Sequence, residues 1–261
     1  MLNHPYSITF GYNLKTQIIM PSTSEVGHAK NVANFQDLIA YCTAYGATYN
    51  PSKTALQLTA LNTLLTSAQT EIANVTTAKN VFDTVTGDRQ VAFEPLKSLA
   101  TKIINYISVT DAADQTIADA KTINNKLQGR RAGTIPENPT PEGGTAPNTV
   151  SVSRQSYDML TENFSALIDL VSSIPSYTPN ETELTTASLT TFRDNLQTAN
   201  TNVTNAEVAY SNARISRDSL LYAENTGLVD TALDVKKYVK AIFGATSSQY
   251  KQISGIKFTK P

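Results

Sequence analysis

The chain has 261 residues, a net charge of −1 and a pI near 6.1. This length allows one large domain or two of ordinary size, each with its own hydrophobic core. The nearly neutral charge leaves no basic surface for a nucleic acid or an anionic membrane, so neither is expected as a partner.

The surface of this chain is expected to be poor in charge. Charged residues make up 16% of the sequence, below the usual quarter, and 40% of the residues are hydrophobic. Thr, Ser, Asn and Gln provide most of the remaining polar residues. Because like-charge repulsion keeps molecules apart, such a surface opposes self-association only weakly. A simple compositional bias of the lineage explains the same numbers, and both interpretations stay open.

Features that would assign a compartment are missing from the sequence. Cys42 is the only cysteine, so the fold cannot depend on an intrachain disulfide. No apolar run approaches the ~18 residues of a membrane helix, and residues 1–10 lack the pattern of a secretory signal. The compartment is therefore unknown: a cytoplasmic location is the default, and export by a route without a signal remains open.

Residues 1–28 are predicted to form an extended N-terminal arm. Residues 7–12 alternate between polar and apolar types as a short strand does, and Pro21 ends a second extended apolar run at 17–20. We expect this arm to lie on the helices or on a neighbouring molecule. Apolar residues at three- and four-residue spacing then predict a helix over 29–45, which ends at Gly46.

A long segment with an apolar stripe, residues 51–85, occurs in part a second time in the other half of the chain. Its 3-4 spacing predicts a helix that packs along a partner helix, as in a coiled coil. The matches share one constant offset without a gap, and such self-similarity indicates an internal duplication. The matching pairs are Tyr49 and Tyr177, Pro51 and Pro179, Leu56 and Leu184, Leu61 and Leu189, Gln69 and Gln197, Asn74 and Asn202, Val75 and Val203, Thr76 and Thr204, Ala78 and Ala206, Phe82 and Tyr210, and Arg89 and Arg217.

Proline signals predict where these two long helices begin. Asn50-Pro51 and the capping box at 178–181 both place a proline at the first helical position. Between them the sequence predicts a kink or a stop near Pro95, a helix face around 99–107, and a further helix from about Thr110 to Gly129. Residues 133–150 are rich in proline and glycine and are predicted to be a linker.

The second half repeats the plan of the first. Helices are predicted around 157–171, over 180–226 without interruption, over 228–243 and over 247–253. The expected fold is therefore all-α: an arm (1–28), a first helical bundle (29–132), a linker (133–150) and a second homologous bundle (151–261). Each bundle is elongated, antiparallel and built of about four helices. This arrangement resembles spectrin-like modules and helical pore-forming toxins in fold alone, and a fold does not carry a function.

The residue types that support catalysis or metal binding are sparse, and no catalytic, cofactor or metal site is predicted. A Cys42–His28 nucleophile pair is formally possible, although a lone cysteine on an apolar helix face is usually a core residue. Asp111, Asp114 and Asp119 favour a helix N-terminus more than a cation site. Tyrosines at 41, 45 and 49 fit either a contact patch or the rim of a core.

The sequence favours a protein that is not an enzyme. We expect a structural or scaffold protein that self-assembles, or binds a protein partner, through long helical faces. Two similar halves would give each molecule two similar faces, as a homo-oligomer or a filament requires. The alternative is a membrane-acting component, similar to a helical pore-forming toxin, which would need amphipathic helices that refold on lipid.

Overall fold

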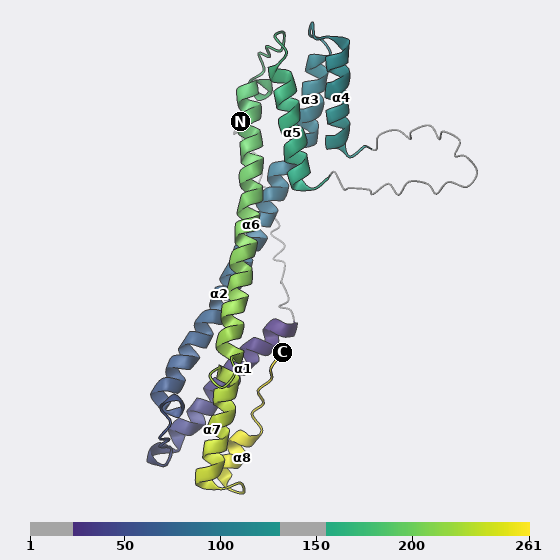
Figure 1. The fold of residues 1–261 in the computed structure, drawn as a ribbon. Helices are drawn as coiled ribbons and strands as arrows, with labels where there is room; N and C mark the ends of the chain where they lie inside the picture. Colours follow the sequence, from purple (N-terminus) through teal and green to yellow (C-terminus); the bar gives the residue numbers. More distant parts are fainter. Residues whose placement is uncertain (1–22, 131–154) are drawn as a thin grey trace, which may run out of the picture. The chain divides into compact units, whose positions relative to one another are not determined.

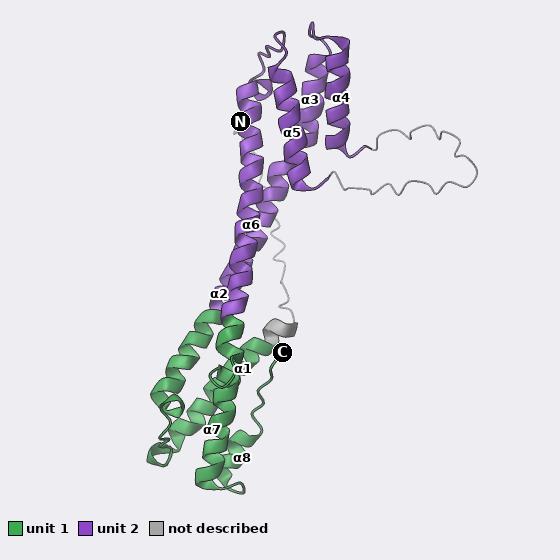
Figure 2. Cartoon of the chain, in the orientation of Figure 1, with its two compact units in different colours: residues 1–72, 217–261 green, residues 73–216 purple. Residues whose placement is uncertain are grey.

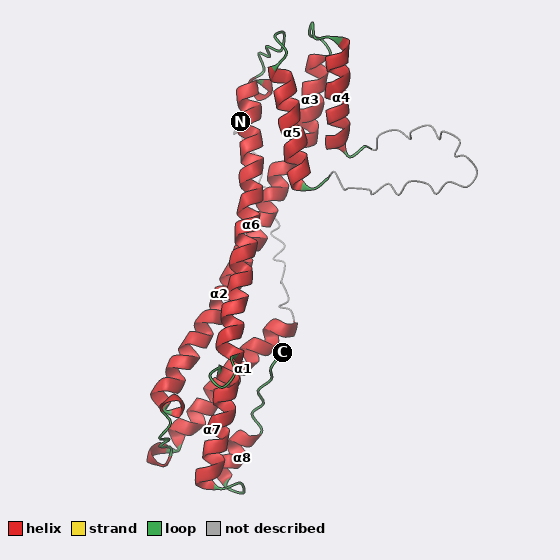
Figure 3. Cartoon of the chain, viewed as in Figure 1, coloured by secondary structure: helices red, strands yellow, loops and turns green. Residues whose placement is uncertain are grey.

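The computed structural model describes residues 23–130 and 155–261 (Figure 1). Within these residues the secondary structure is helical and contains no strand (Figure 3), which confirms the predicted all-α class. Most of the predicted arm (1–28) and the whole predicted linker (133–150) lie outside the described residues. None of the described helices combines the length and the hydrophobicity needed to cross a bilayer.

The helices of the first half begin inside the segment assigned to the arm. They are α1 (Thr23–Ala44), α2 (Leu58–Phe93), α3 (Leu96–Ile107) and α4 (Asp114–Gln128), with short 3-10 turns η1 (Gly46–Thr48) and η2 (Thr54–Leu56) between α1 and α2. The second half contains α5 (Tyr157–Ser172), the 3-10 turn η3 (Thr182–Leu184), α6 (Thr186–Tyr222), α7 (Leu228–Phe243) and α8 (Ser248–Ser254).

Several helix ends follow local signals in the sequence. Gly129 adopts a left-handed conformation (φ 76°), while its N–H and that of Arg130 bond back to the carbonyls of Lys126 and Asn125. This is the Schellman arrangement that glycine favours at a helix C-terminus. At the N-termini of α5 and α8, the hydroxyls of Ser156 and Ser247 accept hydrogen bonds from backbone N–H groups of the first turn.

The two long helices begin later than their prolines predict. In the first half the buried hydroxyl of Tyr49 donates to the carbonyl of Leu56 at 2.7 Å, and α2 begins at Leu58. In the second half the hydroxyl of Tyr177 donates to the carbonyl of Leu184 at 2.8 Å, and α6 begins at Thr186. Each tyrosine thus closes a loop that contains a 3-10 turn, and Pro51 and Pro179 lie in these loops instead of starting helices.

Two compact units divide the described residues (Figure 2). Unit 1 consists of residues 23–72 and 217–261, and unit 2 consists of residues 73–130 and 155–216. Each has its own hydrophobic core. The core of unit 1 includes Phe35, Leu38, Cys42, Leu61, Leu228 and Val235, and that of unit 2 includes Leu96, Ile103, Leu127, Phe164, Leu167 and Leu189.

The compact units are assembled differently from the predicted ranges 29–132 and 151–261. In unit 1, α1 of the first half packs against α7 and α8 of the second half. In unit 2, α3 and α4 of the first half pack against α5 of the second half. Each unit therefore buries apolar faces from both halves, because the covering helix comes from the other half. The ranges remain a prediction of where the sequence repeats.

Helices α3 and α7 occupy the same role in the two units. Each packs on the 3-10 turn of the other half: α3 contacts η3, and α7 contacts η2. Their buried faces correspond residue by residue at a second constant offset, which we call the α3–α7 register. The corresponding pairs are Leu96 and Leu228, Ala100 and Ala232, Ile103 and Val235, and Ile107 and Val239.

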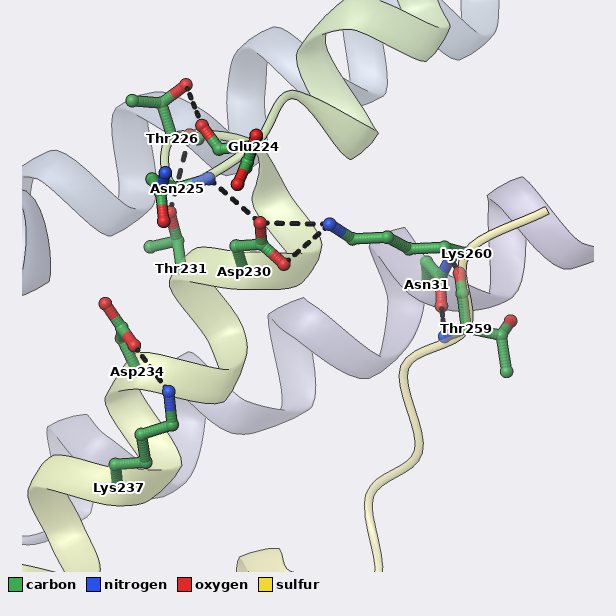
Figure 4. Close-up of polar contacts among 10 residues, drawn as sticks. All are labelled: Asn31, Glu224, Asn225, Thr226, Asp230, Thr231, Asp234, Lys237, Thr259 and Lys260. Carbon is green, nitrogen blue, oxygen red and sulfur yellow. Dashed lines mark hydrogen bonds and ion pairs between the residues drawn. The ribbon is translucent and has the colours of Figure 1, made fainter.

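Unit 1 is completed by the C-terminal segment after α8, which polar contacts hold against α1 and α7 (Figure 4). The amide of Asn31 donates to the carbonyl of Thr259 at 2.7 Å and accepts from its N–H at 3.1 Å. Lys260 pairs with Asp230 at 2.8 Å. Lys236 donates to the carbonyls of Ser254 and Ile256 at 3.0 and 2.8 Å.

Candidate interaction surface

The formally possible nucleophile pair, Cys42 and His28, is not brought together. Both residues lie on α1, and fourteen helical residues span about 21 Å. Cys42 is fully buried, and burial raises the pKa of its thiol to about 12. The thiol is therefore protonated at neutral pH and is a packing residue, while the His28 ring bonds to the hydroxyl of Tyr222 instead.

The acidic and aromatic candidates do not form a site either. Among the described residues no group of His, Cys, Asp and Glu side chains has the geometry of a metal site, and this includes Asp111, Asp114 and Asp119. The three tyrosines have separate roles. Tyr49 is buried, Tyr45 donates to the carbonyl of Gln249 at 2.8 Å, and Tyr41 is 38% exposed.

A different surface stands out in unit 2, where α2 and α6 each carry an exposed row without charge. The α2 row consists of Thr77, Asn80, Val81 and Thr84, and the α6 row consists of Asn205, Val208, Ala209 and Asn212. The spacing i, i+3, i+4, i+7 places each row on one helix face. Every member of the second row follows its counterpart by the same offset that relates Tyr49 to Tyr177. We call these rows the uncharged stripes.

Exposed valines lie within both stripes. Val81 is 50% exposed and Val208 is 54% exposed, so each leaves about half of an apolar side chain in water. Single exposed apolar residues are common on soluble proteins. Here each valine lies in a row of uncharged neighbours, and the α2 stripe with Val85 lines a shallow depression of about 290 Å³. A partner surface that covers the stripes would remove these valines from water without burying a charge.

Threonine hydroxyls reduce the polarity of this surface further. Thr84 on α2 donates its hydroxyl to the carbonyl of Asn80 at 2.9 Å, four residues earlier. Beside the α6 stripe, Thr201 and Thr204 bond in the same way to the carbonyls four residues before them, at 3.0 and 3.3 Å. A hydroxyl that is bonded to its own helix needs water less, and the methyl group of such a threonine remains available for contact.

The charged residues close to the α2 stripe pair with each other. Lys79 and Asp83 are four residues apart and form an ion pair of 2.5 Å. An i, i+4 pair of this kind leaves little net field along the helix. This pair adds little net charge beside the α2 stripe, while exposed Asp88, one turn after Thr84, and exposed Glu207, next to Val208, place negative charge near the stripes.

A polar depression of about 550 Å³ lies between α5 and α6 in unit 2. Asp158, Glu162 and Arg193 contribute its charged groups. The carboxylate of Asp158 accepts a hydrogen bond from Asn200 at 3.1 Å, and Arg193 pairs with its neighbour Asp194 at 2.7 Å. Thr161 and Ser165 add hydroxyl groups to its lining, and Thr161 donates its hydroxyl to the carbonyl of Tyr157 at 2.9 Å.

The sequence prediction named no site residue, and it therefore missed the stripes. The signal was available: uncharged residues recur at i, i+3, i+4 and i+7 in both of the long segments that the sequence matches to each other. The same spacing also describes a face that packs in the core, and only the folded chain shows that these side chains, including Val81 and Val208, are exposed. No protein-family model, curated protein or solved structure matches the chain.

Proposed function

We propose that the protein is a non-enzymatic structural or scaffold protein that binds copies of itself through exposed faces of its long helices. The observation that carries the proposal is the pair of uncharged stripes on α2 and α6. Each stripe has a half-exposed valine at its centre. The positions of the two rows are related by a fixed offset, although the valines occupy neighbouring positions: Val81 corresponds to Ala209, and Val208 corresponds to Asn80. Similar faces on one chain permit repeated contacts between identical molecules.

Tandem duplication is part of this proposal. Loops closed by Tyr49 and Tyr177, the turns η2 and η3, and the helices α2 and α6 recur at one common offset. The packing of α3 on η3 recurs as the packing of α7 on η2. These correspondences support two homologous segments within 29–132 and 151–261, as the sequence predicts, and long helices that associate as in a coiled coil.

The test is to place a charge in each stripe of the full-length protein. In the double variant V81K/V208K, association would bury two ammonium groups, which is unfavourable without a counter-charge. We expect the wild-type protein to associate with increasing concentration in sedimentation velocity experiments, and the variant to remain monomeric. V109K is the control for a lysine at an exposed valine outside the stripes, because Val109 is 82% exposed, and the single variants V81K and V208K match its one added charge.

Two results would contradict the proposal. If the wild-type protein stays monomeric at all concentrations, the protein does not self-associate. If V81K/V208K and V109K associate equally, the stripes are not the contact surface. Adding neutral or anionic liposomes to the same samples tests the alternative. Leakage of liposomes by a monomeric protein would favour a membrane-acting component instead.

A further inference from the structure

The two halves of the chain recognise each other through one kind of contact that is made twice. The ring of Tyr49 in the first half packs edge-on against Tyr238 of the second half, with centroids 5.4 Å apart at 89°. The ring of Tyr177 in the second half packs in the same manner against Tyr106 of the first, at 5.2 Å and 80°. Since Tyr49 corresponds to Tyr177 and Tyr106 to Tyr238, the halves exchange roles between the two contacts.

This reciprocity creates a problem of specificity. If both halves carry the same apolar faces, the first half of one molecule fits the first half of a second molecule almost as well as it fits its own second half. Apolar contacts are non-directional and discriminate poorly between such similar partners. Pairing between like halves would join two molecules in a dimer in which each core is built from two copies of the same half.

Charged residues beside these ring contacts are not the same in the two halves. In unit 1, Lys53 of the first half pairs with Asp234 of the second half at 2.9 Å. In unit 2, Lys102 of the first half pairs with Glu183 of the second half at 2.8 Å. The first half supplies the lysine in both units, and the second half supplies the carboxylate.

The two ion pairs occupy similar places in the two units. Lys102 on α3 corresponds to Asp234 on α7 in the α3–α7 register. Glu183 lies in η3, and Lys53 directly precedes the matching turn η2. At the offset that relates Tyr49 to Tyr177, the counterpart of Lys53 is Glu181, two residues before Glu183. The second half therefore carries acidic residues at α7 and at its turn, where the first half carries lysines at α3 and at its turn.

We propose that these two ion pairs make each half of the chain select the other half and reject a second copy of itself. Pairing of two first halves would bring Lys53 of one molecule to Lys102 of the other. Pairing of two second halves would bring Glu183 to Asp234. Both replace an attraction with a repulsion, which is the usual way to exclude a similar but wrong partner. The inference rests on the duplication proposed above and not on the uncharged stripes.

The double variant K102E/E183K isolates this effect. Within one molecule this variant keeps two attractive ion pairs. Lys53 still pairs with Asp234, and the glutamate introduced at position 102 pairs with the lysine introduced at position 183. Between like halves of two molecules it makes every pair attractive. Lys53 faces the glutamate introduced at position 102, and the lysine introduced at position 183 faces Asp234. The control K53E/K102E/E183K/D234K reverses all four charges, so it keeps attraction within the molecule and repulsion between like halves.

The three proteins are denatured, refolded at high protein concentration and separated by size-exclusion chromatography with light scattering. Exposed ion pairs are individually weak, but the dimer contains the changed pair twice in each of its two interfaces. We therefore expect about a tenfold larger dimer-to-monomer ratio for K102E/E183K than for the wild type and the control, because several exposed pairs act together. Circular dichroism of the monomer fractions establishes that all three proteins fold.

A zero-length carbodiimide cross-linker identifies the pairing, because it joins amines only to carboxylates in contact. The wild type should give the 53–234 and 102–183 links within single molecules, as judged with a mixture of normal and ¹⁵N-labelled protein. Dimers of K102E/E183K should add 53–102 and 183–234 links between molecules. Equal dimer fractions in all three proteins, or dimers without these links, would overturn the proposal. Association through the uncharged stripes can be told apart from like-half pairing. It would be equal in the wild type, K102E/E183K and the control, and V81K/V208K would abolish it.

Discussion

The two compact units bury similar faces but are completed in different ways. In unit 2 the last helix of the group, α4, has 15 residues and packs along α5, and its end is sealed by Gly129. In unit 1 the last helix, α8, has only 7 residues and is followed by the C-terminal segment. Unit 1 thus adds polar contacts from Asn31, Lys236 and Asp230 to the apolar packing of Ile253, Ile256 and Phe258. In unit 2, α4 buries Ala120 and Leu127.

This difference shows which parts of two similar cores tolerate change. The faces of α3 and α7 are both apolar at the four positions of the α3–α7 register, where each methylene removed from a close-packed core is costly. The outer covering of each core contributes less per residue, so a helix in one unit can be replaced by a bonded segment in the other. Lys236 illustrates the change: its counterpart in the α3–α7 register is Ile104, which is buried in unit 2.

The largest expected effects come from the two buried phenylalanines, one in each core. Phe35 in unit 1 and Phe164 in unit 2 are both fully buried. We expect Phe35→Ala and Phe164→Ala each to lower the free energy of unfolding by about 3–5 kcal/mol, measured by urea denaturation. Hydrogen exchange should show the loss of protection mainly in the unit that carries the substitution. Equal loss in both units for both variants would mean that the units do not behave as separate cores.

A smaller effect is expected where the C-terminal segment meets α1 in unit 1. Asn31 is 2% exposed and makes two hydrogen bonds to the backbone of Thr259. Asn31→Ala should lower stability by about 1–2 kcal/mol and should increase hydrogen exchange in α8 and residues 255–261. Asn34→Ala is the control, since its hydrogen bond to the carbonyl of Lys257 is exposed. A loss for Asn34→Ala as large as that for Asn31→Ala would refute the importance of the buried amide.

The loops closed by Tyr49 and Tyr177 test whether the same tyrosine–carbonyl hydrogen bond contributes equally to the stability of both units. Tyr49→Phe and Tyr177→Phe each remove a buried hydroxyl and leave a carbonyl, of Leu56 or Leu184, without its donor. We expect a loss of about 1 kcal/mol for each in urea denaturation. Tyr238→Phe removes a hydroxyl that makes no hydrogen bond within the described residues, and it should be nearly neutral. Unequal losses for the first two variants would show that the loops are not equivalent.

The smallest expected effect is a difference in acid sensitivity. Hydrogen bonds from Lys53 and Lys237 hold the pKa of Asp234 below its usual value, and those from Lys260 and the Asn225 N–H lower the pKa of Asp230. A depressed carboxyl pKa contributes stability that is present above about pH 4, the pKa in the unfolded chain, and is lost as the pH falls toward the folded value. The corresponding residues of unit 2 are Lys102 and Ser98, which are not acids.

We therefore expect acid to weaken unit 1 through these two groups. D230N/D234N should be less stable than the wild type at pH 7, and the difference should shrink at pH 3, as measured by urea denaturation. The expected stability difference is small because the side chains of Asp230 and Asp234 are partly exposed. A difference that grows as the pH falls would contradict the assigned direction of the pKa shifts.

Much of the local structure was predictable because its causes are local. The 3-4 spacing of apolar residues indicates the helices, and Gly129, Ser156 and Ser247 mark helix ends through their own backbone and side-chain bonds. The prolines at 51 and 179 misled the prediction for a nonlocal reason. Each of their loops is held by a tyrosine hydroxyl that reaches a carbonyl seven residues away, and no dipeptide signal encodes that reach.

The all-α class, most helix positions and the resemblance between the segments around Tyr49 and Tyr177 follow from the order of residues along the chain. The folded chain was needed to show that α1 is covered by α7 and α8, and α5 by α3 and α4. An amphipathic stripe specifies that a helix needs an apolar partner, but it does not name the partner, because burial of apolar surface has no direction. For the same reason the exposed stripes of α2 and α6 emerged only when the core was known. Charge does carry directional information, in the inverted pairs of Lys53 with Asp234 and Lys102 with Glu183, but it becomes readable only when folding places these residues in contact.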